Sequence, residues 1–116
     1  MLDLLGTIEA AELPDGRYLV SAHGSLDGRL AHLLHDTVVP LVGADGIPLI
    51  IDLDDAHGLD DEILAVISHA AHLATRHGER LSIVTRNRAI TTLVDGSGLS
   101  DIVNVFPTLR GALDRD

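Results

Sequence analysis

Hydrophobic positions in this chain alternate between two spacings, one helical and one extended. Apolar residues recur at helical spacing from about Arg29 to Val42, and again, most strongly, from Asp61 to His77. Short apolar runs bounded by glycine, proline and polar residues predict strands. The predicted strands are Leu4–Ala11, Tyr18–Ala22, Ile47–Leu53, Arg80–Thr85 and Ile102–Phe106. Two shorter helices are expected, one capped by Asn87 and one from Pro107 to Leu113.

Turn-forming residues separate these elements. Pro14-Asp15-Gly16 has the composition of a tight turn and joins the first two strands as a hairpin. Gly24-Ser25-Leu26-Asp27 is expected to end the second strand, and Pro40 to kink or end the helix that follows. The segment from Asp54 to Asp60 is predicted to be a polar loop, and Gly96-Ser97-Gly98 to stop the third helix.

The resulting order is β-β-α-β-α-β-α-β-α, which predicts the α/β class. Strands that alternate with helices form mostly parallel sheets. We therefore expect a mixed, mostly parallel sheet of about five strands with four helices and an antiparallel first strand at one edge. Residues 1–116 are expected to form a single domain.

Composition restricts the chemistry. The chain has no cysteine, and its eight basic residues are all arginine, so thiol nucleophiles, Schiff bases and phosphate-loop lysines are excluded. A net charge of −10 argues against a nucleic-acid partner. Apolar runs are too short for a bilayer span and no signal peptide is visible, so we expect no membrane insertion and a cytoplasmic location.

Carboxylates gather between the third strand and the second helix, at Asp52, Asp54, Asp55, Asp60, Asp61 and Glu62. A calcium loop is excluded because Ala56 and His57 replace a required ligand and the turn glycine. One hypothesis is a magnesium-dependent phosphotransfer or hydrolytic enzyme using Asp52, Asp54 and Asp60. Such sites usually need a lysine to neutralise the phosphoryl group, and none exists.

Histidines and serines add no recognisable site. His32/His35 and His69/His72 are each three residues apart, and each pair would be half a zinc site. The simpler interpretation is exposed polar helix surface. No serine occupies a Gly-x-Ser-x-Gly elbow. We therefore expect no catalytic residue, no metal site and no cofactor.

Five segments together match one known pattern: Gly24-Ser25-Leu26-Asp27, Leu49–Leu53, Leu59–Ile67, Val94–Leu99 and Leu109–Leu113. In this register they resemble the STAS domain, the family of anti-sigma factor antagonists, and the resemblance spans about Thr7 to Leu113. It implies a STAS-like fold and a non-catalytic protein. The partner it implies is an anti-sigma factor that is itself a serine kinase. The implied partner-binding residues are Asp27, Leu59, Asp60, Asp61, Glu62 and Ile63.

The resemblance also exposes a departure at its regulatory position. In the family, a serine after the conserved aspartate is phosphorylated, and this switches partner binding off. Here Asp60 keeps the aspartate, but Asp61 occupies the phosphoacceptor position, Glu62 replaces the second hydroxyl residue and Ile63 replaces a glycine. A carboxylate cannot be phosphorylated in place of the serine hydroxyl, so the usual switch is absent.

Three alternatives stay open at this point. Asp61 is either a helix N-cap or a permanent, partial mimic of phosphoserine, and both roles are compatible. Ile63 is turned either into the core or toward a partner. Small STAS proteins also resemble accessory subunits of lipid-transport ATPase complexes, which need a similar docking face. The partner's identity, the oligomeric state and any other modified serine or threonine are not determined by the sequence.

Overall fold

Five strands form one sheet in the order β1-β2-β3-β4-β5, with β1 antiparallel to β2 and the other pairs parallel. This computed structural model describes residues 6–43 and 48–114. The predicted order of elements and the antiparallel edge strand are confirmed. The elements are β1 (Thr7–Glu12), β2 (Tyr18–Leu26), α1 (Gly28–Gly43), β3 (Leu49–Leu59), α2 (Asp61–Arg76), β4 (Leu81–Val84), α3 (Arg88–Gly96), the 3-10 helix η2 (Leu99–Asp101), β5 (Val103–Phe106) and α4 (Leu109–Leu113).

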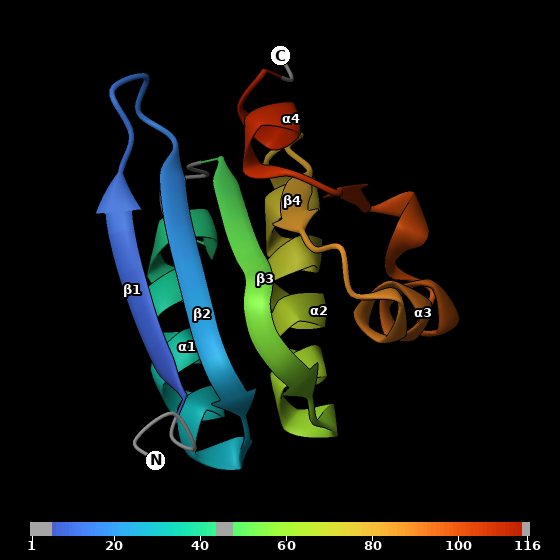
Figure 1. Ribbon diagram of the computed structural model, residues 1–116. Coiled ribbons are helices and arrows are strands. Elements are labelled where there is room, and N and C mark those ends of the chain that lie inside the picture. The colour runs from blue at the N-terminus through green and yellow to red at the C-terminus, as the bar shows by residue number, and fades with distance from the viewer. Residues whose placement is uncertain (1–5, 44–47, 115–116) are drawn as a thin grey trace.

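Helices α1 and α2 lie side by side on one face of the sheet (Figure 1). The main core fills the space between these helices and the inward side chains of the strands, because alternate strand residues point to the same face. A smaller cluster of Ile50, Val84 and Ala112 lies on the opposite face, under α4. Helices α1 and α2 therefore cover one face of the sheet except along the largely exposed β1, and the other face is covered only in part.

Strand β3 is longer than predicted, because the expected loop from Asp54 to Asp60 is mostly strand. It continues to Leu59 beside β2, with register shifts in the pairing between the two strands. Along it, Leu53 and Ala56 both face the core although they are three residues apart. A bulge breaks the two-residue alternation in this way. Because the segment is also rich in polar residues, its sequence resembles that of a loop.

Two other boundaries also differ from the prediction. Strand β2 runs through Gly24 to Leu26, because β3 extends alongside and pairs with it. Helix α1 passes Pro40 and ends at Gly43. Pro40 is exposed and has no amide to donate to the carbonyl of Asp36, so the last turn of the helix forms with one backbone bond fewer. Leu4, Leu5 and Ile47, also expected in strands, lie outside the described residues.

The last two helices begin close to the predicted positions, and the predicted cap Asn87 is confirmed. The Asn87 side chain accepts a hydrogen bond from the amide of Ala89 and begins α3, and Thr108 accepts one from the amide of Gly111 and begins α4. The 3-10 turn η2 was not predicted. Within residues 6–43 and 48–114, none of the helices has the length and apolar character needed to cross a membrane.

Candidate functional site

The carboxyl ends of β2 and β3 meet the amino ends of α1 and α2 at one end of the molecule, at the bottom of the view in Figure 1. Ligands of α/β proteins commonly bind beyond the carboxyl ends of strands. The topology brings together Asp27, which follows β2, and the segment from Leu59 to Glu62, which joins β3 to α2. These residues are about thirty positions apart in sequence.

Asp60, and not Asp61, is the N-cap of α2. Its backbone is extended, with φ −94° and ψ 176°, and its Oδ1 accepts a hydrogen bond of 3.0 Å from the amide of Ile63. Asp61 is the first helical residue and its side chain is exposed. The predicted capping role of Asp61 is therefore wrong. Its negative charge still lies in the first turn, where it interacts favourably with the helix dipole.

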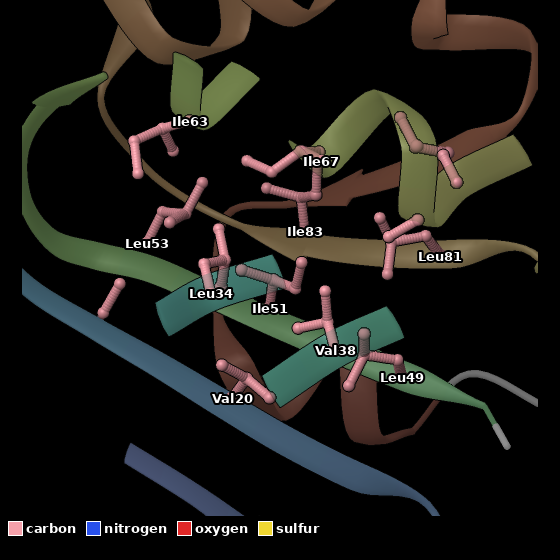
Figure 2. Close-up of a cluster of buried hydrophobic side chains, with 14 of the residues drawn as sticks. Val20, Leu34, Val38, Leu49, Ile51, Leu53, Ile63, Ile67, Leu81 and Ile83 are labelled. Atoms are coloured by element: carbon pink, nitrogen blue, oxygen red, sulfur yellow. The ribbon is translucent and has the colours of Figure 1, made fainter. Parts of the chain in front are cut away.

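Ile63 is a core residue. Its side chain is completely buried, and Figure 2 shows it on the same side of the sheet as Ile67, pointing toward Leu53 of β3. Of the two orientations that the sequence left open, the structure has the inward one. Ile63 cannot contact a partner directly, so its inclusion among the partner-binding candidates is corrected.

Asp27 and Glu62 flank the beginning of α1. The Asp27 carboxylate accepts a hydrogen bond of 3.1 Å from the amide of Arg29, and its carbonyl accepts one of 3.0 Å from Leu30, so Asp27 caps this helix. A Cβ added at Gly28 would run into the Glu62 carboxylate. Glu62 therefore reaches from α2 to the amino end of α1, where negative charge is favoured.

A shallow pocket of about 270 Å³ lies between the ends of β2 and β3. Its lining comprises Ser25, Leu26, His57, Gly58, Leu59 and Asp60. The predicted site residues included Leu59 and Asp60 but not Ser25, Leu26, His57 or Gly58. The sequence carries only a weak signal for this pocket, because the pocket depends on pairing between β2 and β3. The prediction of a loop at residues 54–60 leaves no such pairing there.

The carboxylates proposed for a magnesium enzyme are engaged elsewhere. Arg86 donates from its backbone amide, Nε and NH2 group to Asp54, with a shortest distance of 2.6 Å, and Asp52 accepts from the amide of Asp54. The Arg86 side chain holds the pKa of Asp54 below its usual value. Within the described residues, no three histidine or carboxylate side chains are placed to hold a metal ion together. The arrangement gives Asp52, Asp54 and Asp60 no shared ligand role.

The four helical histidines are exposed, as predicted. His35 of α1 and His69 of α2 are stacked, with ring centroids 6.0 Å apart and planes 1° from parallel. The sequence did not indicate this contact, because it joins the two histidine pairs across helices. Beside it, a groove between α1 and α2 is lined by Ala31, His32, His35, Glu62, Ala65 and Val66.

Comparison with known proteins agrees with the fold. The STAS domain family matches residues 8–112. RsfA, an anti-sigma-F factor antagonist of Mycobacterium tuberculosis, is 28% identical over 101 residues, covering 85% of this chain and 79% of RsfA. A crystal structure of an anti-sigma factor antagonist from Mycobacterium paratuberculosis is 26% identical with a TM-score of 0.80, covering 97% of this chain and 94% of that chain.

The fold is also shared with a more distant protein. Bacillus SpoIIAA in its phosphorylated form is 12% identical with a TM-score of 0.78, covering 94% of this chain and 98% of that one. At this identity the likeness concerns the fold alone. The match of the family over nearly the whole length, together with the five-stranded sheet and its helices, leads to one conclusion: this chain belongs to the STAS domain family.

Proposed function

We propose that this protein is an anti-sigma factor antagonist that binds an anti-sigma factor of the serine-kinase type. The observation that carries the proposal is the STAS match over residues 8–112, together with relatives that are anti-sigma factor antagonists. The binding surface, here called the docking surface, comprises Asp27, Leu59, Asp60, Asp61 and Glu62. The proposed role is binding, and it requires no catalytic residue on this surface.

The charge of the docking surface limits which partner fits. Asp27, Asp61 and Glu62 are exposed and lie where two helices begin. A partner must offset these carboxylates with basic residues, because like charges across an interface are costly. The anti-sigma factor is therefore expected to present arginine or lysine here, and binding should weaken as salt screens the charges.

Asp61 makes the binding independent of the usual phosphorylation. The position carries no hydroxyl, so a serine kinase cannot transfer a phosphoryl group there. A carboxylate has one charge and two oxygens, whereas phosphoserine has about −1.5 to −2 charges and three terminal oxygens. Because a carboxylate imitates phosphoserine only in part, we propose that Asp61 does not switch partner binding off as phosphoserine does. We propose that the protein is either constitutively active or controlled by other means.

Capture of the tagged protein from its native host tests this proposal. The wild-type chain should retain an anti-sigma factor with a kinase fold, identified by mass spectrometry, and Asp61→Arg should lose it. Asp95→Arg is the matched control, because Asp95 is exposed on α3, away from the docking surface. Retention of a lipid-transport ATPase in place of an anti-sigma factor would contradict the proposal.

A second variant tests the switch. Asp61→Ser restores a hydroxyl at the phosphoacceptor position. With the captured partner and magnesium ATP, this variant should gain the mass of one phosphoryl group at residue 61, and the wild-type chain should not. A partner that binds Asp61→Ser without modifying it would show that the partnership does not use a serine-kinase switch.

A further inference from the structure

We infer that the pocket between the ends of β2 and β3 receives one arginine or lysine side chain of the anti-sigma factor. This inference rests on the proposed function and names the chemistry of the contact. The pocket opens beside Asp60 and Leu59, so it is continuous with the docking surface. It would hold the partner by one side chain seated in this shallow pocket.

The size of the pocket favours a single side chain. Its volume is about 270 Å³, below the range of about 300–1,000 Å³ that is usual for pockets binding drug-sized molecules. Leu26 and Leu59 supply apolar wall, against which the aliphatic stem of a long basic side chain can pack while its charged end reaches polar groups. A buried aromatic or basic anchor of this kind dominates the energy of many interfaces.

The polar groups of the pocket select a donor carrying positive charge. Asp60 Oδ1 accepts from the Ile63 amide, and Oδ2 has no recorded partner among residues 6–43 and 48–114. In the same part of the chain, the exposed Ser25 hydroxyl also has no recorded partner. Asp60 therefore offers a carboxylate oxygen and Ser25 a hydroxyl oxygen, both able to accept hydrogen bonds. Arginine and lysine donate several such bonds and carry the complementary charge.

The surroundings reinforce this choice. Asp61 is adjacent in sequence to Asp60 and is exposed, and Asp27 immediately follows Leu26 of the pocket wall. Arg29 is the nearby arginine, and it already lies 4.0 Å from the Asp27 carboxylate. A cation entering the pocket thus meets the Asp60 carboxylate, with those of Asp61 and Asp27 next in sequence to lining residues and the His57 imidazole also in the lining. An acidic side chain there would meet uncompensated repulsion.

Gly58 provides a way to close the pocket without disturbing the fold. A Cβ added at Gly58 meets no atom within 4 Å, and its φ is not in the left-handed region. Gly58→Leu should therefore fold normally and fill the pocket. Gly96 at the end of α3 shares both properties, so Gly96→Leu is the matched control.

The experiment measures the affinity of the purified chain for the anti-sigma factor captured from the host, by calorimetry. Gly58→Leu should weaken binding by roughly tenfold or more, since the anchor is excluded, and Gly96→Leu should bind as the wild type does. Asp60→Asn keeps a good N-cap but removes the charge. It should also weaken binding by roughly tenfold, with a smaller effect at high salt.

The variants separate the possible results. Unchanged affinity of Gly58→Leu overturns the pocket inference and leaves the proposed function standing. Weak binding of Gly58→Leu with unchanged binding of Asp60→Asn means that an apolar side chain enters the pocket, which also overturns it. Failure of the wild-type chain to bind any anti-sigma factor overturns both proposals. Circular dichroism of each variant verifies that the fold is retained.

Discussion

The carboxylate of Asp60 accepts a hydrogen bond from the backbone amide of Ile63, at 3.0 Å. The bond spans the first turn of α2 and satisfies one of the amides that a helix start leaves unpaired. It also places Asp61 outward and Ile63 inward, on opposite sides of the helix. One local contact therefore decides which residue caps the helix, which is exposed and which belongs to the core.

Removal of the cap should cost more than removal of the neighbouring charge. We expect Asp60→Ala to lower the free energy of unfolding by about 1 kcal/mol. Asp61→Ala, which loses only a favourable charge near the helix dipole, should lower it by about 0.5 kcal/mol or less. Asp60→Asn should be close to wild type. Urea unfolding of the three variants measures this; a larger loss for Asp61→Ala than for Asp60→Ala would contradict the assignment.

Truncation of Ile63 should destabilise the protein strongly, because the side chain is fully buried among core residues. Ile63→Ala should cost about 2–5 kcal/mol, and Ile63→Val about 0.5–1.5 kcal/mol. Both are measurable by urea unfolding. Ile63→Gly, which a surface position would tolerate, should lose even more stability. If Ile63→Ala unfolded at the same urea concentration as the wild type, the inward orientation would be wrong.

The ion pair of Asp54 and Arg86 should make stability depend on pH at the acid end. Arg86 lowers the pKa of Asp54 from its usual 3.8, so the folded state binds the proton less readily than the unfolded state. The contribution is complete above about pH 5 and is lost as the pH falls below 3.8 toward the lowered value.

Asp54→Asn should therefore be less stable than the wild type at pH 7, and this difference should shrink as the pH falls to about 2. Urea unfolding at a series of pH values measures the difference. Asp95→Asn on α3 is the control, since Asp95 has no ion pair within the described part of the chain. A difference between Asp54→Asn and the wild type that stayed constant with pH would rule out the ion pair as its cause.

Arg17 should hold the C-terminal helix against the sheet. Its two terminal nitrogens donate to the carbonyls of Ala112 and Leu113, at 3.4 and 2.9 Å, and its Nε donates to Asp15. Lysine cannot reproduce this fork of donors. In Arg17→Lys, hydrogen exchange at the amides of Ala112 and Asp114 should accelerate, whereas exchange in β3 should not. If exchange at Ala112 and Asp114 were the same in Arg17→Lys as in the wild type, α4 would be held by packing alone.

Local signals in the sequence predicted most of the fold. Helix α2 was found with its start at Asp61, because its apolar spacing is regular and Gly78 stops it. Asn87 was identified as the cap of α3, and the structure has its side chain bonded to the amide of Ala89. In both cases the decisive contacts lie within a few residues of each other, so the pattern alone reports them.

The errors arose where pairing between distant segments decides the outcome. Residues 54–59 are polar, and only their position beside β2 makes them a strand, since Gly24 pairs with Ala56 and Leu26 with Leu59. The pocket with Ser25 and Gly58 exists only because of this pairing. No local pattern distinguishes such a bulged strand from a loop, because both lack the two-residue alternation.

By itself, the sequence determined the order of the elements, the strongly negative charge and the absence of a hydroxyl at position 61. These follow from residue identity and from spacing along one segment. The tertiary structure decided that Asp60 caps α2, that Ile63 is buried, and that Ser25 and Asp60 share a pocket. The burial of Ile63 and the pocket both depend on which distant segments pack together. Asp60 and Asp61 are both suitable N-caps for α2, and only the backbone geometry decides between them.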